Sequence, residues 1–303
     1  MTDVIVARSL TKRYDELVAV DAIDFTIHER ECFGFLGPNG AGKTTIIRMI
    51  QCVSPLTSGT LSVLGMDVDK DERKIKEVVG VVPQDNNLDP DFNVLKNLTV
   101  YASYFGIDKG TAQKKAEELL RFMQLTEKKD AKIDEISGGM KRRLTIARAL
   151  INDPKVLILD EPTTGLDPQA RHVIWDKIRE LKERGVTVIV TTHYMEEAQR
   201  LCDRLVIMET GKILVEGEPN SLITKIIGSS VVEVIEPTAE VEEFGKQSGW
   251  NQERADDRLF IYTNENQEVR SRLQQRFPTV NVLIRDATLE DVFLKLTGRG
   301  LKE

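Results

Sequence analysis

The chain has 303 residues, 41% of them apolar and 30% charged, and its net charge is -7. This length suits two unequal domains, and the acidic balance argues against nucleic acid as a partner. The three cysteines lie far apart without metal-ligand spacing, as expected for core residues in a reducing compartment. The N-terminus lacks a signal-peptide pattern, and no apolar run is long enough to cross a bilayer, so we expect a cytoplasmic protein.

The N-terminal stretch predicts strands. Val4 to Arg8 is a candidate strand, and Ile23, Phe25 and Ile27 alternate with polar residues, which is typical of a half-buried strand. Tyr14 lies between them. Taken alone it is an ordinary edge-strand aromatic, but its position ahead of a phosphate-binding loop makes it a candidate to stack on an adenine ring.

A phosphate-binding motif follows, matching G-x-x-x-x-G-K-[ST]. Its residues are Gly37, Pro38, Asn39, Gly40, Ala41, Gly42, Lys43, Thr44 and Thr45. A predicted buried strand, Glu31 to Leu36, precedes it and a predicted helix follows, which is the context that phosphate binding needs. Lys43 is expected to reach the β- and γ-phosphates and the Thr44 hydroxyl to bind Mg²⁺. The motif predicts nucleoside triphosphate binding.

A second buried strand, Val78 to Val82, ends at Pro83 and Gln84. Polar side chains at the carboxyl end of a strand in an α/β sheet face the ligand crevice. Gln84 is therefore a candidate to contact Mg²⁺ or the attacking water, although a loop glutamine without a role is the more common case.

The segment 85–153 predicts helices only, and so a helical insertion in the α/β core. Ser137, Gly138 and Gly139 open its last helix and form a second anion-binding helix start. One triphosphate cannot contact both helix starts unless two copies of the chain meet. The basic cluster 141–143 is expected to be a solvated helix face.

The apolar run Val156 to Leu159 predicts a central parallel strand, and it ends in Asp160 and Glu161. Two carboxylates there are costly to bury unless a cation or a reaction requires them. Asp160 fits a Mg²⁺ partner that acts through water, and Glu161 fits a general base for the attacking water. The alternative, an acidic pair that caps a helix, is weakened by the intervening segment 162–165.

Asp167 precedes the next helix, and the strand Val186 to Thr191 ends just before His193. A lone histidine is usually structural. His193 stands at the same sheet edge as the other candidate ligands, which favours contact with the γ-phosphate.

These features, in this order, resemble the nucleotide-binding subunit of ATP-binding-cassette (ABC) transporters over Val4 to Pro219. The resemblance implies a P-loop NTPase core with an antiparallel β subdomain and a helical insertion at about 85–153, together forming a domain over 1–219. It also implies that two chains associate head to tail, with each ATP between one phosphate loop and the partner's Ser-Gly-Gly signature. Ser137 and Gly139 would contact the γ-phosphate across that interface, and Asp167 would bridge the chains.

Met140 stands where the family's commonest signature has glutamine. The form Gly-Met-Lys-Arg-Arg resembles the exporter subgroup of the daunorubicin-resistance and nodulation-factor (ABC-2) type, and so does Arg171-His172. The resemblance implies a separate integral-membrane permease, which would hold the chain at the inner face of the cell membrane.

The segment 220–303 predicts a small α+β domain with an antiparallel sheet. Its ending, 287–299, resembles the C-terminal extension of the same subgroup. In the plainer interpretation the last helix packs Leu289, Val292, Phe293 and Leu296 on its own domain. In the alternative the domain stabilises a dimer or regulates it.

The function predicted is an ATP hydrolase that powers an exporter through ATP-driven homodimerisation. The main alternative is a soluble ABC ATPase of translation or DNA maintenance, but the chain has neither a long coiled-coil insertion nor a second cassette. A P-loop kinase would leave the Ser-Gly-Gly signature and His193 without a role.

Overall fold

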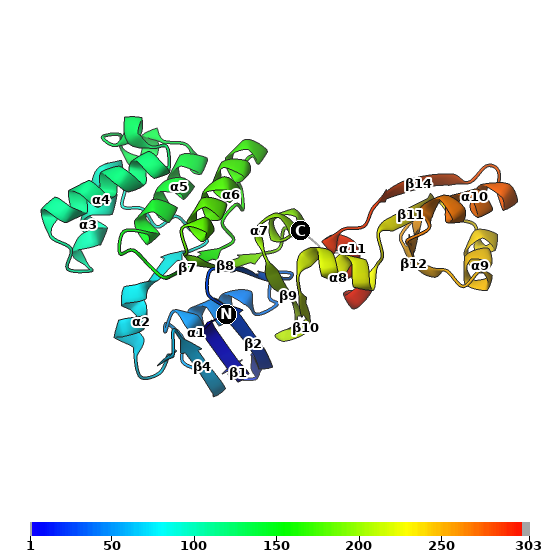
Figure 1. Cartoon of the computed structure of the whole chain (residues 1–303), viewed down its shortest axis with the longest axis horizontal. Helices are drawn as coiled ribbons and strands as arrows, with labels where there is room; N and C mark the ends of the chain where they lie inside the picture. Colours follow the sequence, from blue (N-terminus) through cyan, green and yellow to red (C-terminus); the bar gives the residue numbers. More distant parts are fainter. Residues whose placement is uncertain (1, 299–303) are drawn as a thin grey trace. The chain divides into compact units, whose positions relative to one another are not determined.

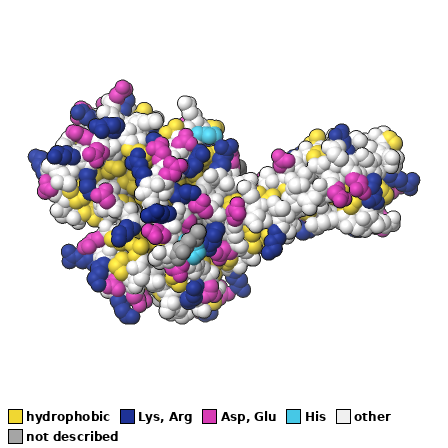
Figure 2. Space-filling model, in the orientation of Figure 1, with side chains coloured by type: hydrophobic (Ala, Val, Ile, Leu, Met, Phe, Trp, Pro, Cys, Tyr) yellow, Lys and Arg dark blue, Asp and Glu magenta, His cyan; other side chains and the backbone are white. Residues whose placement is uncertain are grey.

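The computed structural model describes residues 2–298, so Arg299 in the C-terminal stretch discussed above lies outside it. The chain divides into two compact units, Met1–Val215 and Glu216–Glu303 (Figure 1). Among the described residues, no helix is long and apolar enough to cross a membrane. On the face shown in Figure 2, basic and acidic side chains are interspersed over both units.

The first unit begins with an antiparallel sheet in the order β2-β1-β4-β5. The strands are β1 (Asp3–Tyr14), β2 (Leu17–His28), β4 (Ser58–Val63) and β5 (Met66–Asp67). The predicted alternation in β2 is confirmed, because Ile23, Phe25 and Ile27 are at most 4% exposed while the residues between them face outward or are half-buried. This one-sided burial is how an antiparallel sheet covers a core.

The second sheet has the order β10-β9-β3-β8-β7-β6. Its strands are β3 (Cys32–Leu36), β6 (Val79–Val82), β7 (Val156–Asp160), β8 (Thr187–Thr192), β9 (Arg204–Glu209) and β10 (Lys212–Gly217). The pairs β3–β8, β3–β9, β6–β7 and β7–β8 are parallel. Every residue of β3, β7 and β8 is buried, which explains their continuous apolar runs. The carboxyl ends of these three strands therefore meet at one edge of the sheet.

Helix α1 (Lys43–Ile50) joins the two sheets into one core. Its Ile46, Ile47 and Met49 are at most 1% exposed and belong to the same hydrophobic cluster as Phe25 of β2 and Phe35 of β3. The phosphate loop therefore precedes a helix that is held by both sheets.

The segment 85–153 contains helices and no strand, as predicted, apart from one isolated bridge between Asn93 and Lys132. Its helices are α3 (Val94–Ser103), α4 (Lys109–Phe122), the short 3₁₀ helices Thr126–Lys128 and Ile133–Glu135, and α5 (Gly138–Ala149). Figure 1 shows α3, α4 and α5 side by side. The remaining helices of the first unit are α2 (Glu72–Val78), α6 (Pro168–Glu183) and α7 (Met195–Leu201).

The solvated helix face predicted for the basic cluster is wrong at one position. Arg142 is only 4% exposed, and Lys141 and Arg143 are half-buried. The reason is that α5 packs between neighbouring elements, and its second turn meets backbone carbonyls rather than water.

The second unit is an α+β domain whose antiparallel sheet has the order β12-β13-β11-β14. Its elements are α8 (Pro219–Ile226), β11 (Ser230–Ile235), α9 (Ala239–Gln247), β12 (Asn251–Ala255), β13 (Arg258–Thr263), α10 (Asn266–Arg276), β14 (Asn281–Asp286) and α11 (Leu289–Thr297). The last helix, α11, packs against α8 and buries Leu289, Val292 and Phe293. The expected burial of Leu296 is wrong, since it is 36% exposed and lies toward the end of the helix.

We expect the contact between β6 and α5 to limit the size of residue 80. A Cβ on Gly80 would lie 2.2 Å from the carbonyl oxygen of Ala149. Replacing Gly80 by alanine therefore forces the strand and the helix apart, at a cost of about 2 kcal/mol in the free energy of unfolding. Urea unfolding measures this, with Gly110→Ala on the exposed start of α4 as the control, since alanine fits there. Equal stability of the two variants would contradict the packing described.

Candidate functional site

Two glycines fix the path of the phosphate loop between β3 and α1. A Cβ on Gly37 would lie 2.4 Å from the carbonyl oxygen of Met208, and one on Gly42 would lie 2.5 Å from that of Ala19. Gly42 also has a φ of 102° at the N-cap of α1. Glycine alone fits both positions, and the tight curl brings the loop to a helix N-terminus, where free N–H groups favour an anion.

Lys43, the first residue of α1, is buried at this loop with 5% of its surface exposed. Its Nζ donates to the carbonyl oxygens of Gly37 at 2.7 Å and Pro38 at 3.0 Å, and lies 3.9 Å from Glu161 Oε1. Burial lowers the pKa of Lys43, and the charges of Glu161 and Asp160 oppose that shift. A buried ammonium group beside a glycine loop suits the binding of phosphate oxygens.

The two carboxylates at the end of β7 are both buried, with 7% of Asp160 and 8% of Glu161 exposed. Asp160 Oδ1 accepts a short hydrogen bond from the Thr191 hydroxyl on β8. Glu161 has a φ of 46°, in the left-handed region, and its N–H donates to the Thr191 carbonyl at 3.0 Å. A non-glycine residue in this region is strained, and such strain is common at functional sites.

The Glu161 carboxylate is the centre of the site. It accepts from Gln84 Nε2 at 3.3 Å and from the Thr164 hydroxyl at 3.2 Å, and His193 Nδ1 lies 3.2 Å from its Oε1. These groups come from the ends of β6 and β8 and from the loop after β7. The structure therefore brings Lys43, Gln84, Glu161 and His193 together, although they are up to 150 residues apart.

A cavity of about 380 Å³ opens beside this cluster. It is lined by Tyr14, Leu17, Val18, Ala19, Asn39, Gly40, Ala41, Gly42, Lys43, Thr44, Thr45, Gln84, Glu161 and Thr210. Tyr14 is 41% exposed, its hydroxyl lies 3.3 Å from Ser54 Oγ, and Lys12 Nζ lies 4.8 Å from its ring centroid. The cavity thus runs from an exposed aromatic ring to a buried cation and a carboxylate.

The signature residues and Asp167 do not line this cavity. Ser137 caps α5 by accepting from the Met140 N–H at 3.3 Å, and Asp167 caps α6 by accepting from the Ala170 N–H at 2.9 Å. Ser137, Gly138 and Asp167 are exposed. The two helix starts are neighbours, because a Cβ on Gly139 would lie 3.0 Å from the Ala170 Cβ.

Glu197 of α7 is a buried acid that sequence reasoning did not identify. It accepts from the Thr163 hydroxyl at 2.7 Å and from Trp175 Nε1 at 3.0 Å, and so ties the segment after Glu161 to α6 and α7. Burial raises the pKa of Glu197, and hydrogen bonds from Thr163, Thr192 and Trp175 oppose the shift. The role of Glu197 is visible only in the folded chain, because its partners Thr163 and Trp175 lie far from it in the sequence. Sequence reasoning also missed Thr191, although its position near the end of the buried strand β8 was an available signal.

This geometry has counterparts in known proteins. The ABC transporter family model matches residues 20–164, and the model of the nodulation factor export protein NodI C-terminal domain matches residues 239–298. The "Nod factor export ATP-binding protein I" of Burkholderia lata is 47% identical over 301 residues, covering 98% of this chain and 97% of that protein. That of Rhizobium etli is 47% identical over 296 residues, covering 97% and 93%.

Two solved ABC cassettes are also similar to this chain in fold. CbiO1 from Clostridium perfringens, part of the cbiONQ ABC transporter complex, has a TM-score of 0.70 and 28% identity, covering 74% of this chain and 92% of that one. The cassette MJ0796, solved as a dimer in a post-hydrolysis state bound to ADP and Pi, has a TM-score of 0.64 and 27% identity, covering 71% and 98%.

A phosphate loop, an acidic strand end and a separate signature helix on this fold define an ABC-transporter ATPase. Within that class, the chain belongs to the Nod factor export ATP-binding protein I family. The predictions of an ABC fold, of ATP binding and hydrolysis coupled to transport, and of the exporter subgroup are confirmed. This membership favours the transport function over the non-transport ABC ATPase. Of the similar cassettes, MJ0796 was solved as a dimer and cbiO1 is part of the cbiONQ ABC transporter complex.

The raised pKa of Glu197 predicts a pH-dependent effect of Glu197→Gln. The native state holds the proton more tightly than the unfolded chain, so the wild type loses stability as pH rises above the ordinary value of 4.5. Glutamine does not titrate. The stability of the variant relative to the wild type should therefore improve between about pH 5 and about pH 8.

Urea unfolding at both pH values measures this difference. Glu196→Gln, at the exposed neighbouring position, is the control and should show no such trend. A stability difference between Glu197→Gln and wild type that does not change with pH would contradict the assigned shift.

Proposed function

We propose that this chain hydrolyses ATP at sites shared by two copies of itself and thereby powers export through a separate membrane subunit. The observation that carries the proposal is the separation of the phosphate loop from the signature. The cavity contains Lys43 and Glu161, whereas Ser137 and Asp167 are exposed at helix starts outside it. A second chain would supply its signature to this cavity, and the dimeric structure of MJ0796 supports such an arrangement.

Each cluster residue takes a distinct role in this proposal. The phosphate loop from Gly37 to Thr45 and Lys43 would hold the β- and γ-phosphates, and the Tyr14 ring would stack on the adenine. Glu161 would orient and deprotonate the attacking water, because it is the carboxylate that faces the cavity beside Lys43. His193 holds one oxygen of Glu161 and would contact the γ-phosphate.

The signature roles complete the site from the other chain. The N–H groups at the start of α5, with Ser137, Gly138 and Gly139, would face the partner's γ-phosphate and stabilise its developing charge. Asp167 caps the neighbouring helix, close to the signature, and would contact the partner chain.

The residues present fit a magnesium ion at this site. Thr44 lies beside Lys43 in the cavity lining, Gln84 supplies an amide oxygen, and Asp160 is a buried carboxylate at the same sheet edge. Hard oxygen ligands of these kinds suit Mg²⁺. The ion would neutralise charge on the phosphate oxygens, and Asp160 would act through water.

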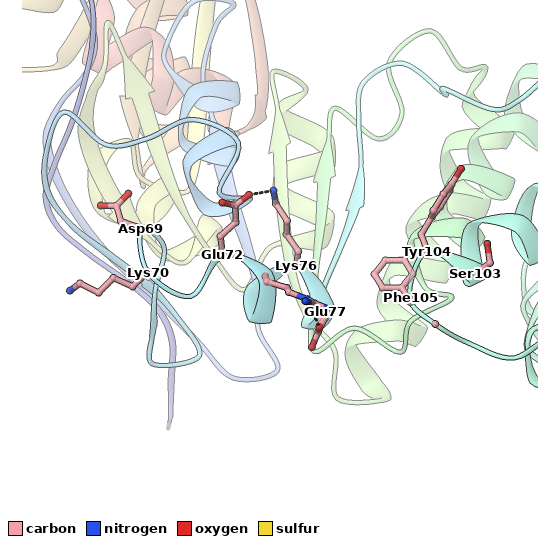
Figure 3. Close-up of a pocket in the computed structure, with 10 residues that line it drawn as sticks. Asp69, Lys70, Glu72, Lys76, Glu77, Ser103, Tyr104 and Phe105 are labelled. Atoms are coloured by element: carbon pink, nitrogen blue, oxygen red, sulfur yellow. Dashed lines mark hydrogen bonds and ion pairs between the residues drawn. The ribbon is translucent and has the colours of Figure 1, made fainter.

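The membrane subunit needs a docking surface, and a hollow in the first unit fits that need (Figure 3). It has a volume of about 840 Å³ and lies between α2 and the end of α3. Figure 3 shows Glu72, Lys76 and Glu77 of α2 across from Tyr104 and Phe105. Tyr104 is 78% exposed, which is unusual for a large aromatic side chain.

We infer that an amphipathic segment of the permease occupies this hollow. Charged side chains on one wall and aromatic rings on the other match a segment with one polar and one apolar face. Docking would hold the chain at the inner face of the membrane. The helical insertion that carries Tyr104 also carries the signature helix α5, so a permease bound here contacts the part of the cassette that would meet the partner's ATP.

We propose Nod factor as the cargo, because the relatives are named as Nod factor export proteins. The support is that the similarity spans the whole chain, including the C-terminal domain at residues 239–298.

Glu161→Gln tests the shared site. ATP binding should persist, because the phosphate loop is unchanged. Hydrolysis should fall by at least about 100-fold, the usual contribution of a general base. Size-exclusion chromatography with ATP and Mg²⁺ should then show a dimer that wild type forms only transiently. Hydrolysis at the wild-type rate would show that Glu161 is not the base.

Tyr104→Glu tests the docking surface. The charge should prevent burial of residue 104 against the permease, so the subunits should no longer co-purify from membranes. Lys114→Glu, at an exposed position on α4 away from the hollow, is the matched control and should co-purify normally. ATP binding by the isolated chain verifies folding. Retained co-purification of Tyr104→Glu would place the permease elsewhere.

A further inference from the structure

Arg142 uses all five of its N–H donors on main-chain carbonyl oxygens. Nε donates to Pro162 at 2.7 Å, Nη1 to Pro83 and to Gln84 at 3.1 Å, and Nη2 to Asp160 at 2.8 Å and Glu161 at 3.0 Å. A guanidinium group offers five such donors in a rigid plane. The side chain is 4% exposed, so these bonds are made away from water.

The carbonyls belong to two segments that leave neighbouring strands. Pro83 and Gln84 follow β6, and Asp160 to Pro162 follow β7. Where a chain leaves a sheet, its carbonyls lose their strand partners, and a buried carbonyl without a donor is costly. Arg142 supplies these donors from α5, so three elements meet at one side chain.

One of these carbonyls belongs to a strained residue. Glu161 has a φ of 46°, in the region that non-glycine residues rarely adopt. Its carbonyl and the carbonyls on either side of it all accept from Arg142. The main chain that carries the carboxylate is therefore held on three consecutive peptide groups, while Lys43, Gln84 and His193 hold the carboxylate itself.

Nearby carboxylates offset part of the cost of burying the Arg142 charge. Burial lowers the pKa of Arg142 to about 10, and the charges of Glu197, Asp160, Asp85 and Glu161 oppose the shift. The group remains cationic at neutral pH and keeps all five donors.

Two other residues of α5 extend the attachment to the loop after Gln84. The Thr145 hydroxyl lies 3.2 Å from the Asn86 carbonyl oxygen, and Arg148 donates to the carbonyls of Asn86 at 3.2 Å and Asn87 at 2.6 Å. Arg142, Thr145 and Arg148 share one face of the helix because they are three residues apart. Of the three, Arg142 alone also reaches the end of β7.

We propose that Arg142 is a positioning residue for ATP hydrolysis, which holds the main chain of Gln84 and Glu161 against the signature helix. It does not touch the reacting atoms. It sets where the Glu161 carboxylate points, and it ties that carboxylate to the helix whose start, at Ser137, serves the partner's nucleotide. The inference rests on the proposed role of Glu161 as the base.

The test compares Arg142→Gln and Arg142→Lys with wild type in steady-state ATP hydrolysis and in equilibrium ATP binding. Glutamine keeps two donors and no charge, and lysine keeps the charge with three donors that cannot span both segments. We expect kcat to fall between about 10- and 100-fold for glutamine, the effect of a small misplacement of a catalytic group. Lysine should retain more activity than glutamine. The Kd for ATP should stay within about twofold, because binding depends on the phosphate loop.

Arg143→Gln is the matched control. Arg143 is the next residue on α5 and also donates to main-chain carbonyls, at Met123 and Gln124, but it does not contact either segment at the site. Its loss should lower thermal stability and leave kcat near the wild-type value.

Two results would overturn the proposal. One is a kcat for Arg142→Gln close to that of wild type. The other is an equal loss of kcat in Arg142→Gln and Arg143→Gln at equal loss of stability, which would show a merely structural role. Glu161→Gln, assayed in parallel, separates the two proposals. If Glu161→Gln hydrolyses ATP at the wild-type rate, Glu161 is not the base, and the proposed function fails at that residue. The effect of Arg142 on kcat is measured separately, by comparing the Arg142 variants with wild type.

Discussion

A cluster of buried charges at one edge of the parallel sheet constrains how the elements of the first unit are arranged. Lys43, Asp160 and Glu161 are 5%, 7% and 8% exposed, respectively. Each charge alone would be costly to bury, and the cost is offset only because opposite charges and hydroxyl donors surround it. This requires that β3, β7 and β8 lie side by side with their carboxyl ends together, which their continuous apolar runs produce.

Two buried cations then define the position of Glu161. Lys43 approaches its side chain from α1, and Arg142 holds its main chain from α5. The first cation belongs to the phosphate loop and the second to the signature helix. In the proposed two-chain arrangement these elements would serve different ATP molecules, so the geometry of Glu161, the proposed base, would be linked to both.

The sequence allowed prediction of the parts whose residue types and spacing are dictated by local chemistry. The phosphate loop needs glycines at Gly37 and Gly42, because neighbouring backbone excludes a Cβ. The acidic pair at the end of β7 follows a continuous apolar run, which is typical of a central strand buried on both faces. Arg142 was not predictable in this way. Its burial depends on carbonyls 18 to 59 residues away in the chain, and a basic residue on a helix otherwise indicates a solvated face.

The C-terminal domain shows the same limit. Its α+β class, its antiparallel sheet and its last helix were predicted, but the strand β12 was not. The sequence of β12, Asn251–Ala255, is polar, and it becomes a strand by pairing along β13. Glu233 and Asp291, 5% and 2% exposed, are both held by Arg285, an ion-pair network that no local pattern indicates.

The central claim, that each ATP is bound by two copies of the chain, is tested most directly by cross-linking. Asn39→Cys in the phosphate loop and Ser137→Cys in the signature are made as separate proteins, both with Glu161→Gln and with Cys52, the half-buried native cysteine, replaced by serine. On oxidation, the mixture should form a disulfide-linked dimer with ATP and Mg²⁺ and not without nucleotide. Neither protein alone should link these positions. A mixture that binds ATP yet gives no link, or links equally without it, would contradict the account.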